Sequence, residues 1–113
     1  MPALRLDRDQ FRQVIINLLE NSVQAIGPEG GEISIRLSYD SALKIARLEC
    51  ADTGHGIAPE NRQRVFEPYY STKAKGTGLG LAIVSSIIAD HNGFIRVRGN
   101  EPRGTVFTVE LPG

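Results

Sequence analysis

The segment DQFRQVIINLLENSVQAI, residues 9–26, decides the fold of this 113-residue chain. Its apolar and small side chains recur at steps of three and four residues, the period of a helix with one buried face. They are Phe11, Val14, Ile15, Leu18, Ser22, Ala25 and Ile26. Asp7 or Asp9 is expected to cap the start of the helix, and Gly27-Pro28 to end it. We therefore predict one long amphipathic helix, whose apolar face needs a second layer to cover it.

Shorter segments that follow this helix predict strands and two more helices. Apolar side chains alternate over residues 32–38, 45–51, 94–98 and 105–111, which is the period of a strand. Pro59 opens a short helix over residues 59–66, and a second long helix over 79–91 ends at Asn92-Gly93. Residues 99–104 join the last two strands as a hairpin. This order predicts an α+β fold, a two-layer α/β sandwich whose mixed, mostly antiparallel sheet is covered on one face by helices.

The composition fits a single globular domain over residues 1–113. Hydrophobic residues make up 41% and charged residues 23%, and 13 basic side chains balance 13 acidic ones, which excludes the basic surface of a nucleic-acid binder. The single Cys50, in an apolar run, is expected to be a small buried thiol, which favours a reducing, cytoplasmic setting. No apolar stretch approaches the roughly 20 residues of a membrane-spanning helix. We therefore expect no direct membrane contact, and an inner-membrane anchor of a full-length protein would lie outside this chain.

The polar face of the first helix is one candidate for a functional site. At about 3.6 residues per turn, six polar side chains fall on one face. They are Gln10, Gln13, Asn17, Glu20, Asn21 and Gln24. Solvated helix faces usually carry Lys and Glu, whereas Asn is a poor helix former. Two asparagines four residues apart therefore leave two interpretations open, a solvated face or a ligand-binding face.

Two glycine-rich segments are further candidates. Asp52-Thr53-Gly54-His55-Gly56 joins a carboxylate to two residues that let the backbone approach a flat ligand, although this pattern is also ordinary turn chemistry. Gly76-Thr77-Gly78-Leu79-Gly80-Leu81 leads into a helix, where exposed backbone N–H groups and the helix dipole can cradle phosphates. Lys73 and Lys75 precede it and would supply positive charge, unless they are solvated loop residues.

The order of these segments resembles the ATP-binding catalytic domain of sensor histidine kinases. Asn17-Leu18-Leu19-Glu20-Asn21 is similar to the N box of that family, and Asp52 to Gly56 to its first glycine box. Phe66 to Tyr70 resembles the F box, and Gly76 to Leu81 the second glycine box. The same superfamily includes DNA gyrase and the ninety-kilodalton heat-shock chaperone. The resemblance runs from about Leu6 to Pro112, and it implies the Bergerat ATP-binding fold with ATP and Mg²⁺ as ligands.

The resemblance also implies roles for single residues. Asn21 would hold Mg²⁺ on the triphosphate with support from Asn17, and Asp52 would bind the adenine amino group with help from Thr105. A lid over residues 68–75, similar to that of nitrogen-regulation kinases, would close on the γ-phosphate through Lys73. Asn17, Asn21 and Lys73 are thus the implied catalytic residues. The implied nucleotide-binding set is Asn21, Gln24, Asp52, Gly54, Gly56, Ile57, Phe66, Tyr70, Lys73, Gly76, Thr77, Gly78, Leu79, Gly80, Leu81 and Thr105.

Two departures from the superfamily define the implied function. Its ATPases place a glutamate at the position of Asn17, whereas an amide cannot act as a general base. Neither His55 nor His91 has the surroundings of the family's phosphoacceptor histidine. The chain is therefore expected to be an excised domain that phosphorylates a histidine on the dimerisation domain of the same kinase, with a response regulator downstream. A non-catalytic ATP-binding switch and an anti-sigma-type serine kinase are the alternatives.

Overall fold

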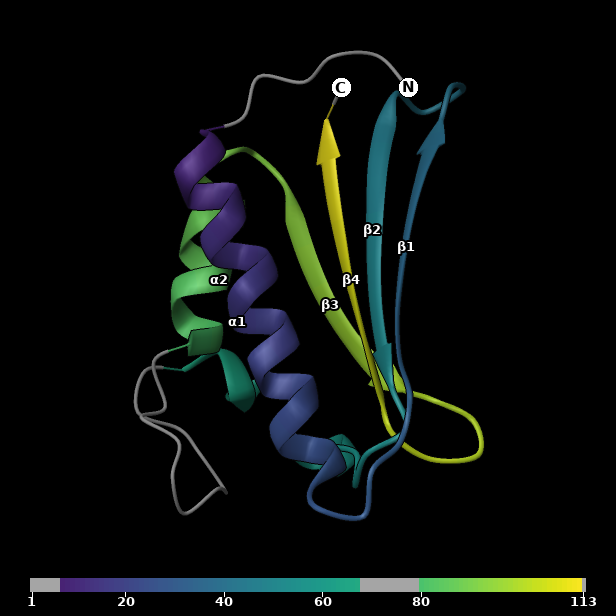
Figure 1. Ribbon diagram of the computed structural model, residues 1–113. Coiled ribbons are helices and arrows are strands. Elements are labelled where there is room, and N and C mark those ends of the chain that lie inside the picture. Colours follow the sequence, from purple (N-terminus) through teal and green to yellow (C-terminus); the bar gives the residue numbers. More distant parts are fainter. Residues whose placement is uncertain (1–6, 68–79, 113) are drawn as a thin grey trace.

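The computed structural model describes residues 7–67 and 80–112 as two layers (Figure 1). Helices α1 (Arg8–Ile26) and α2 (Gly80–Asp90) lie side by side on one face of a four-stranded sheet. Its strands are β1 (Ile33–Asp40), β2 (Ile45–Asp52), β3 (Phe94–Gly99) and β4 (Thr105–Pro112). The expected two-layer α/β sandwich is confirmed. None of the helices in the described residues is long and apolar enough to cross a membrane.

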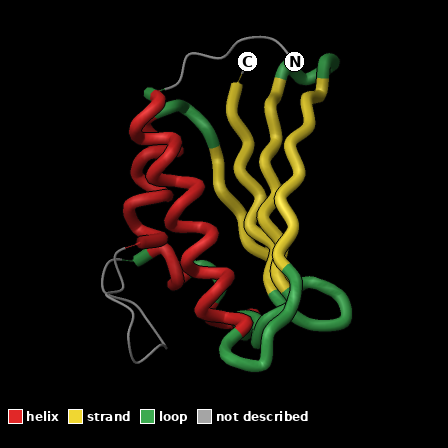
Figure 2. Tube along the Cα trace, viewed as in Figure 1, coloured by secondary structure: helices red, strands yellow, loops and turns green. Residues whose placement is uncertain are grey.

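The strand order is β1-β2-β4-β3, and the strands run next to one another in Figure 2. All three pairings among the described strands are antiparallel, so this part of the chain shows no parallel component of the mixed sheet that was expected. Strand β4 lies between β2 and β3, and its first residue, Thr105, is opposite Asp52, the last residue of β2. The register therefore places the start of β4 against the first residue of the glycine-rich segment 52–56.

Both ends of α1 follow from local sequence. Of the two candidate caps, Asp7 is the N-cap, because its Oδ1 accepts a hydrogen bond of 2.9 Å from the backbone N–H of Gln10. Asp9 lies in the first turn, where a negative charge is favourable beside the helix dipole. Gly27 ends the helix with a φ of 75°, a left-handed conformation that favours glycine. The predicted cap and stop signals are thus confirmed.

The end of α2 is tied to the start of α1. Asn92 has a φ of 60°, and the N–H of Gly93 donates to the carbonyl of Ile88 over 2.9 Å, as in a Schellman motif. Nε2 of His91 accepts from the backbone N–H of Asp7 over 3.1 Å, and its Nδ1 lies 2.8 Å from the carbonyl oxygen of Ile87. Because Nε2 accepts, Nδ1 is the nitrogen that carries the proton in the neutral ring. His91 therefore joins the two helices through backbone groups.

The prediction of one short helix over residues 59–66 was wrong. The segment forms two 3₁₀ helices, Pro59–Asn61 and Arg64–Phe66. The first has no buried side chain, so an α-helix continued through it would gain no packing. The second buries Val65 and places Phe66 edge-to-face against Phe107, with ring centroids 6.2 Å apart.

The core lies between the helices and the inner face of the sheet. Each layer supplies fully buried side chains, which are Val14, Leu18, Val84, Ile88, Leu48, Cys50, Phe107 and Val109. Sγ of Cys50 lies 3.6 Å from Oγ of Ser22, and burial raises the pKa of this thiol, so the expected small buried thiol is confirmed as a protonated core group. The helices and the sheet are thus held together mainly by apolar packing.

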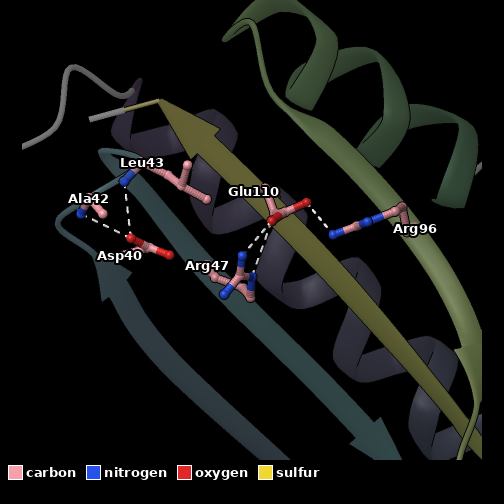
Figure 3. Close-up of polar contacts among 6 residues, drawn as sticks. All are labelled: Asp40, Ala42, Leu43, Arg47, Arg96 and Glu110. Carbon is pink, nitrogen blue, oxygen red and sulfur yellow. Dashed lines mark hydrogen bonds and ion pairs between the residues drawn. The ribbon is translucent and has the colours of Figure 1, made fainter.

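The outer face of the sheet is charged. Figure 3 shows Glu110 of β4 between Arg47 of β2 and Arg96 of β3. Nη2 of Arg47 lies 2.8 Å from Glu110, whose other carboxylate oxygen bonds Arg96. Since Arg47 is a third exposed and Arg96 mostly exposed, these pairs add little to stability.

Strand β1 is covered less than the rest of the sheet. Ile35 and Leu37 are opposite Cys50 and Leu48, so they share the inner face of the sheet with two core residues. They are nevertheless 49% and 57% exposed. The helix layer therefore stops short of this edge of the sheet.

Leu18 offers a test of where the core lies. It is 1% exposed, so Leu18→Ala is expected to lower the free energy of unfolding by about 2–5 kcal/mol through lost apolar contact and an internal cavity. Val23 on the same helix is 61% exposed, and Val23→Ala is expected to cost under about 1 kcal/mol. Urea denaturation of both variants measures the difference, and equal losses would contradict this assignment of the core.

Candidate functional site

The polar stripe of α1 is divided by burial. Asn17 and Asn21 are half-buried, whereas Gln10, Gln13, Glu20 and Gln24 are exposed. Oδ1 of Asn17 accepts a long hydrogen bond of 3.4 Å from Gln13 Nε2. Its Nδ2 is buried and has no partner among the described residues. Because buried donors are nearly always paired, this amide is suited to a ligand oxygen. The ligand-binding interpretation of the stripe is favoured at Asn17.

Asp52 is the most unusual polar group in the described structure. It is 0% exposed, and its Oδ1 accepts a hydrogen bond of 2.8 Å from the backbone N–H of Gly54. Its Oδ2 is buried with no partner among the described residues. A buried carboxylate oxygen is unfavourable until a donor reaches it, so Oδ2 is suited to an N–H group of a ligand.

The loop after Asp52 packs tightly against α1. A Cβ on Gly54 would lie 2.5 Å from the carbonyl carbon of Ala25, so only glycine fits there. The backbone N–H of His55 donates to the carbonyl oxygen of Ala25 over 3.1 Å, while the His55 side chain is exposed. Gly56 has a φ of 78°, which favours glycine. The glycines thus serve a close approach of the Asp52 loop to the end of α1.

Two further predicted residues stand at defined places. Thr105 is buried beside Asp52 across the β2–β4 pairing. Gly80 begins α2, and a Cβ there would lie 3.9 Å from the side chain of Asn17, so Asn17 lies near the positive end of the α2 dipole. The structure therefore brings together two clusters, Asp52 with Gly54 and Thr105, and Asn17 with Gly80.

The other predicted residues differ in their surroundings. Ile57, Phe66 and Leu81 are half-buried and pack against the hydrophobic core. Gln24 is exposed on α1. The remaining predictions fall outside residues 7–67 and 80–112, namely the lid over 68–75, Tyr70, Lys73, Gly76, Thr77, Gly78 and Leu79.

The residues available for a metal are few. The described residues contain no group of three or more His, Cys, Asp or Glu side chains that could hold an ion. Mg²⁺ commonly binds through one or two protein groups together with phosphate oxygens and water, rather than in an all-protein cage. Asn21 is half-buried on the same stripe as Asn17. Asn21 is therefore suited to a metal whose other ligands are phosphate oxygens and water.

Sequence reasoning missed two residues of the site. Nδ2 of Asn100 donates to the backbone oxygen of Asp52 over 2.8 Å, and Nε of Arg103 donates to the backbone oxygen of Gly54 over 2.9 Å. Both lie in the loop that joins β3 to β4, beside an open cavity of about 620 Å³ that Arg62 and His55 also line. Nothing in the local sequence signals contacts with residues so distant along the chain.

Comparison with known proteins agrees with this geometry. Residues 6–113 match the family described as histidine kinase-, DNA gyrase B- and HSP90-like ATPase. The sensor histidine kinase ZraS of Escherichia coli K12 is 42% identical over 112 residues, which are 99% of this chain and 23% of that protein. The chain thus spans about a quarter of the length of this relative.

Solved structures show the same fold. The mycobacterial sensor histidine kinase MprB superposes with a TM-score of 0.85 at 34% identity, over 95% of this chain and 72% of that one. Full-length ShkA in complex with AMPPNP superposes with a TM-score of 0.84 at 35% identity, over 99% of this chain and 23% of that one. With a family match over residues 6–113 and a fold shared with histidine kinases, this chain belongs to the histidine kinase-, DNA gyrase B- and HSP90-like ATPase family.

Proposed function

We propose that this chain is the ATP-binding catalytic domain of a sensor histidine kinase. In this proposal it binds ATP with Mg²⁺ and donates the γ-phosphate to a histidine on a separate dimerisation domain of the same kinase. The observation that carries the proposal is the buried Asp52, whose Oδ2 has no partner in the described residues and lies at the edge of the glycine loop. The likeness to ShkA, solved with AMPPNP, supports it.

Asp52 supports adenine as the base that is bound. The exocyclic amine of adenine is a donor, and a fixed carboxylate oxygen accepts from it without any change of protonation. Buried Thr105, opposite Asp52, adds a hydroxyl group to the same place. Gly54 and Gly56 let the loop after Asp52 lie close to Ala25 and Gly104, and this packing supports a fixed position of the Asp52 carboxylate.

The proposed binding of the ATP phosphates is supported by Asn17, Asn21 and the start of α2. The N-terminus of a helix attracts anions, and Gly80 places that end beside Asn17. Asn21 is proposed to hold Mg²⁺, which would neutralise phosphate charge, while the buried amide of Asn17 meets an oxygen of the same ligand. Lys73 and the lid over residues 68–75 are proposed to contact the γ-phosphate from outside the described residues.

The described side chains support transfer to another domain over hydrolysis. Phosphoryl transfer depends mainly on positioning and charge stabilisation, and Asn17 cannot activate water as a base. His91 has both ring nitrogens placed against backbone groups, and His55 has Nδ1 2.6 Å from the carbonyl oxygen of Gly56. Both ring nitrogens of His91 and Nδ1 of His55 thus already contact backbone groups, and the phosphoacceptor histidine is proposed to come from the dimerisation domain. A response regulator would then receive the phosphoryl group, in a cytoplasmic setting.

Nucleotide binding without turnover is the first expectation. The isolated chain is expected to bind ATP or ADP with Mg²⁺ with a Kd in the micromolar to millimolar range, about 4–8 kcal/mol. Release of inorganic phosphate at saturating ATP is expected to stay at background. Titration calorimetry and a phosphate assay measure the two quantities, and rapid hydrolysis or absence of binding would contradict the proposal.

Asp52→Ala tests adenine recognition. Loss of a charge-assisted hydrogen bond to the exocyclic amine is expected to weaken ATP binding by about 1.5–3 kcal/mol and to lower the preference for ATP over GTP. Glu49→Ala is the control, because Glu49 lies on the same strand but on the outer face, paired with Arg98. If Asp52→Ala and the control bind both nucleotides alike, Asp52 does not recognise adenine.

Phosphotransfer separates the proposal from its two alternatives. With an added histidine-bearing two-helix domain and ATP, the chain is expected to produce acid-labile phosphohistidine on that domain, and Asn21→Ala to abolish it. Acid-stable phosphoserine on a protein substrate would instead favour the serine kinase. ATP binding with no transfer to either substrate would favour the switch module.

A further inference from the structure

The loop between β3 and β4 holds the backbone on both sides of the Asp52 carboxylate. Nδ2 of Asn100 donates to the backbone carbonyl oxygen of Asp52 over 2.8 Å. Nε of Arg103 donates to the backbone carbonyl oxygen of Gly54 over 2.9 Å. Gly104 follows directly, and a Cβ on it would lie 1.9 Å from the backbone oxygen of Asp52. The two loops are therefore in backbone contact, and a larger residue at position 104 would separate them.

These contacts restrain the direction of the carboxylate. Oδ1 of Asp52 accepts a hydrogen bond from the backbone N–H of Gly54. The orientation of the carboxylate, and with it the direction of Oδ2, therefore depends on the backbone conformation at Gly54. Glycine has the widest backbone freedom of any residue, and Gly54 by itself would permit several directions. Arg103 holds the carbonyl oxygen of Gly54 and thereby limits that freedom.

Asn100 is itself held in one orientation. Its Oδ1 accepts from the backbone N–H of Glu101 over 3.0 Å, which leaves Nδ2 directed at the backbone carbonyl oxygen of Asp52. Its own backbone N–H donates to the oxygen of Gly104 over 3.0 Å and closes the loop. The donor that reaches Asp52 is thus fixed from two sides before any ligand arrives.

We propose that Asn100 and Arg103 are positioning residues that set the selectivity of the site for adenine over guanine. The inference rests on the proposed function, in which Asp52 accepts from the base. Adenine offers an amine where guanine offers a carbonyl oxygen, which a carboxylate oxygen repels. When Oδ2 is held rigidly, bound guanine leaves this buried carboxylate oxygen without a hydrogen-bond donor, and binding is weak. When the carboxylate can rotate away, this cost is reduced and guanine is accommodated.

Two substitutions remove one contact each. Arg103→Gln shortens the side chain that reaches Gly54, and Asn100→Asp keeps the acceptor for Glu101 but loses the donor to Asp52. Each is expected to raise the Kd for ATP about tenfold and to lower the ratio of GTP to ATP dissociation constants by a similar factor. Exchange of the Gly54 amide hydrogen without nucleotide is expected to become faster, because the backbone of Asp52 and Gly54 is then held by one contact fewer.

Matched controls carry the same chemical changes elsewhere. Arg96→Gln removes an exposed arginine paired with Glu110 on the outer face, and Asn61→Asp adds a charge in the first 3₁₀ helix. Both are expected to keep the selectivity and the Gly54 exchange rate of the unchanged chain. Both controls are expected to keep its urea midpoint, and each loop variant is expected to lower it by no more than the loss of one part-buried hydrogen bond.

The outcomes distinguish this inference from the proposed function. If the unchanged chain binds ATP and both loop variants keep its selectivity, the positioning role is wrong and the proposed function stands. If the unchanged chain binds no nucleotide, the proposed function is wrong, and the selectivity inference falls with it. Unaltered Gly54 exchange in both variants, or loss of folding in both, would contradict the inference whatever the nucleotide result.

Discussion

The buried carboxylate of Asp52 is the constraint on which the rest of the site depends. Such a group is unfavourable in an apolar interior unless donors surround it, and here one oxygen is paired within the described structure. It stays buried because it ends β2 on the inner face of a sheet whose core includes Cys50 and Phe107. Core packing thus keeps buried a carboxylate whose second oxygen has no partner among the described residues.

Helix α1 sets the distance between the two parts of the site. Asn17 faces the start of α2, and Ala25 contacts the Asp52 loop. Eight residues at about 1.5 Å per residue separate these two positions by roughly 12 Å along the helix. An extended nucleotide spans a comparable distance between its base and its outer phosphates. The contact of His91 with the backbone of Asp7 joins the end of α2 to the start of α1.

Much of the fold could be predicted because the spacing of apolar side chains along the sequence indicates which face of a helix or strand is buried. The α1 pattern, its caps and the Asn92-Gly93 stop were readable since each depends on neighbouring residues. The proposed role of Asp52 needed the resemblance to a family, because its motif alone is also turn chemistry. The 3₁₀ pair and the contacts of Asn100 and Arg103 were not predictable, since they depend on which distant backbone lies beside them. The lid and Lys73 remain predictions.

The thin cover over β1 has a consequence for handling the protein. Within the described residues this strand is paired on one side only, and Ile35 and Leu37 extend beside its open edge. Unpaired N–H and C=O groups next to apolar side chains are a template for adding another strand. Arg36 lies between the two apolar residues on the opposite face, and its charge opposes stacking without closing the edge. We therefore expect edge-to-edge association through β1 at high protein concentration.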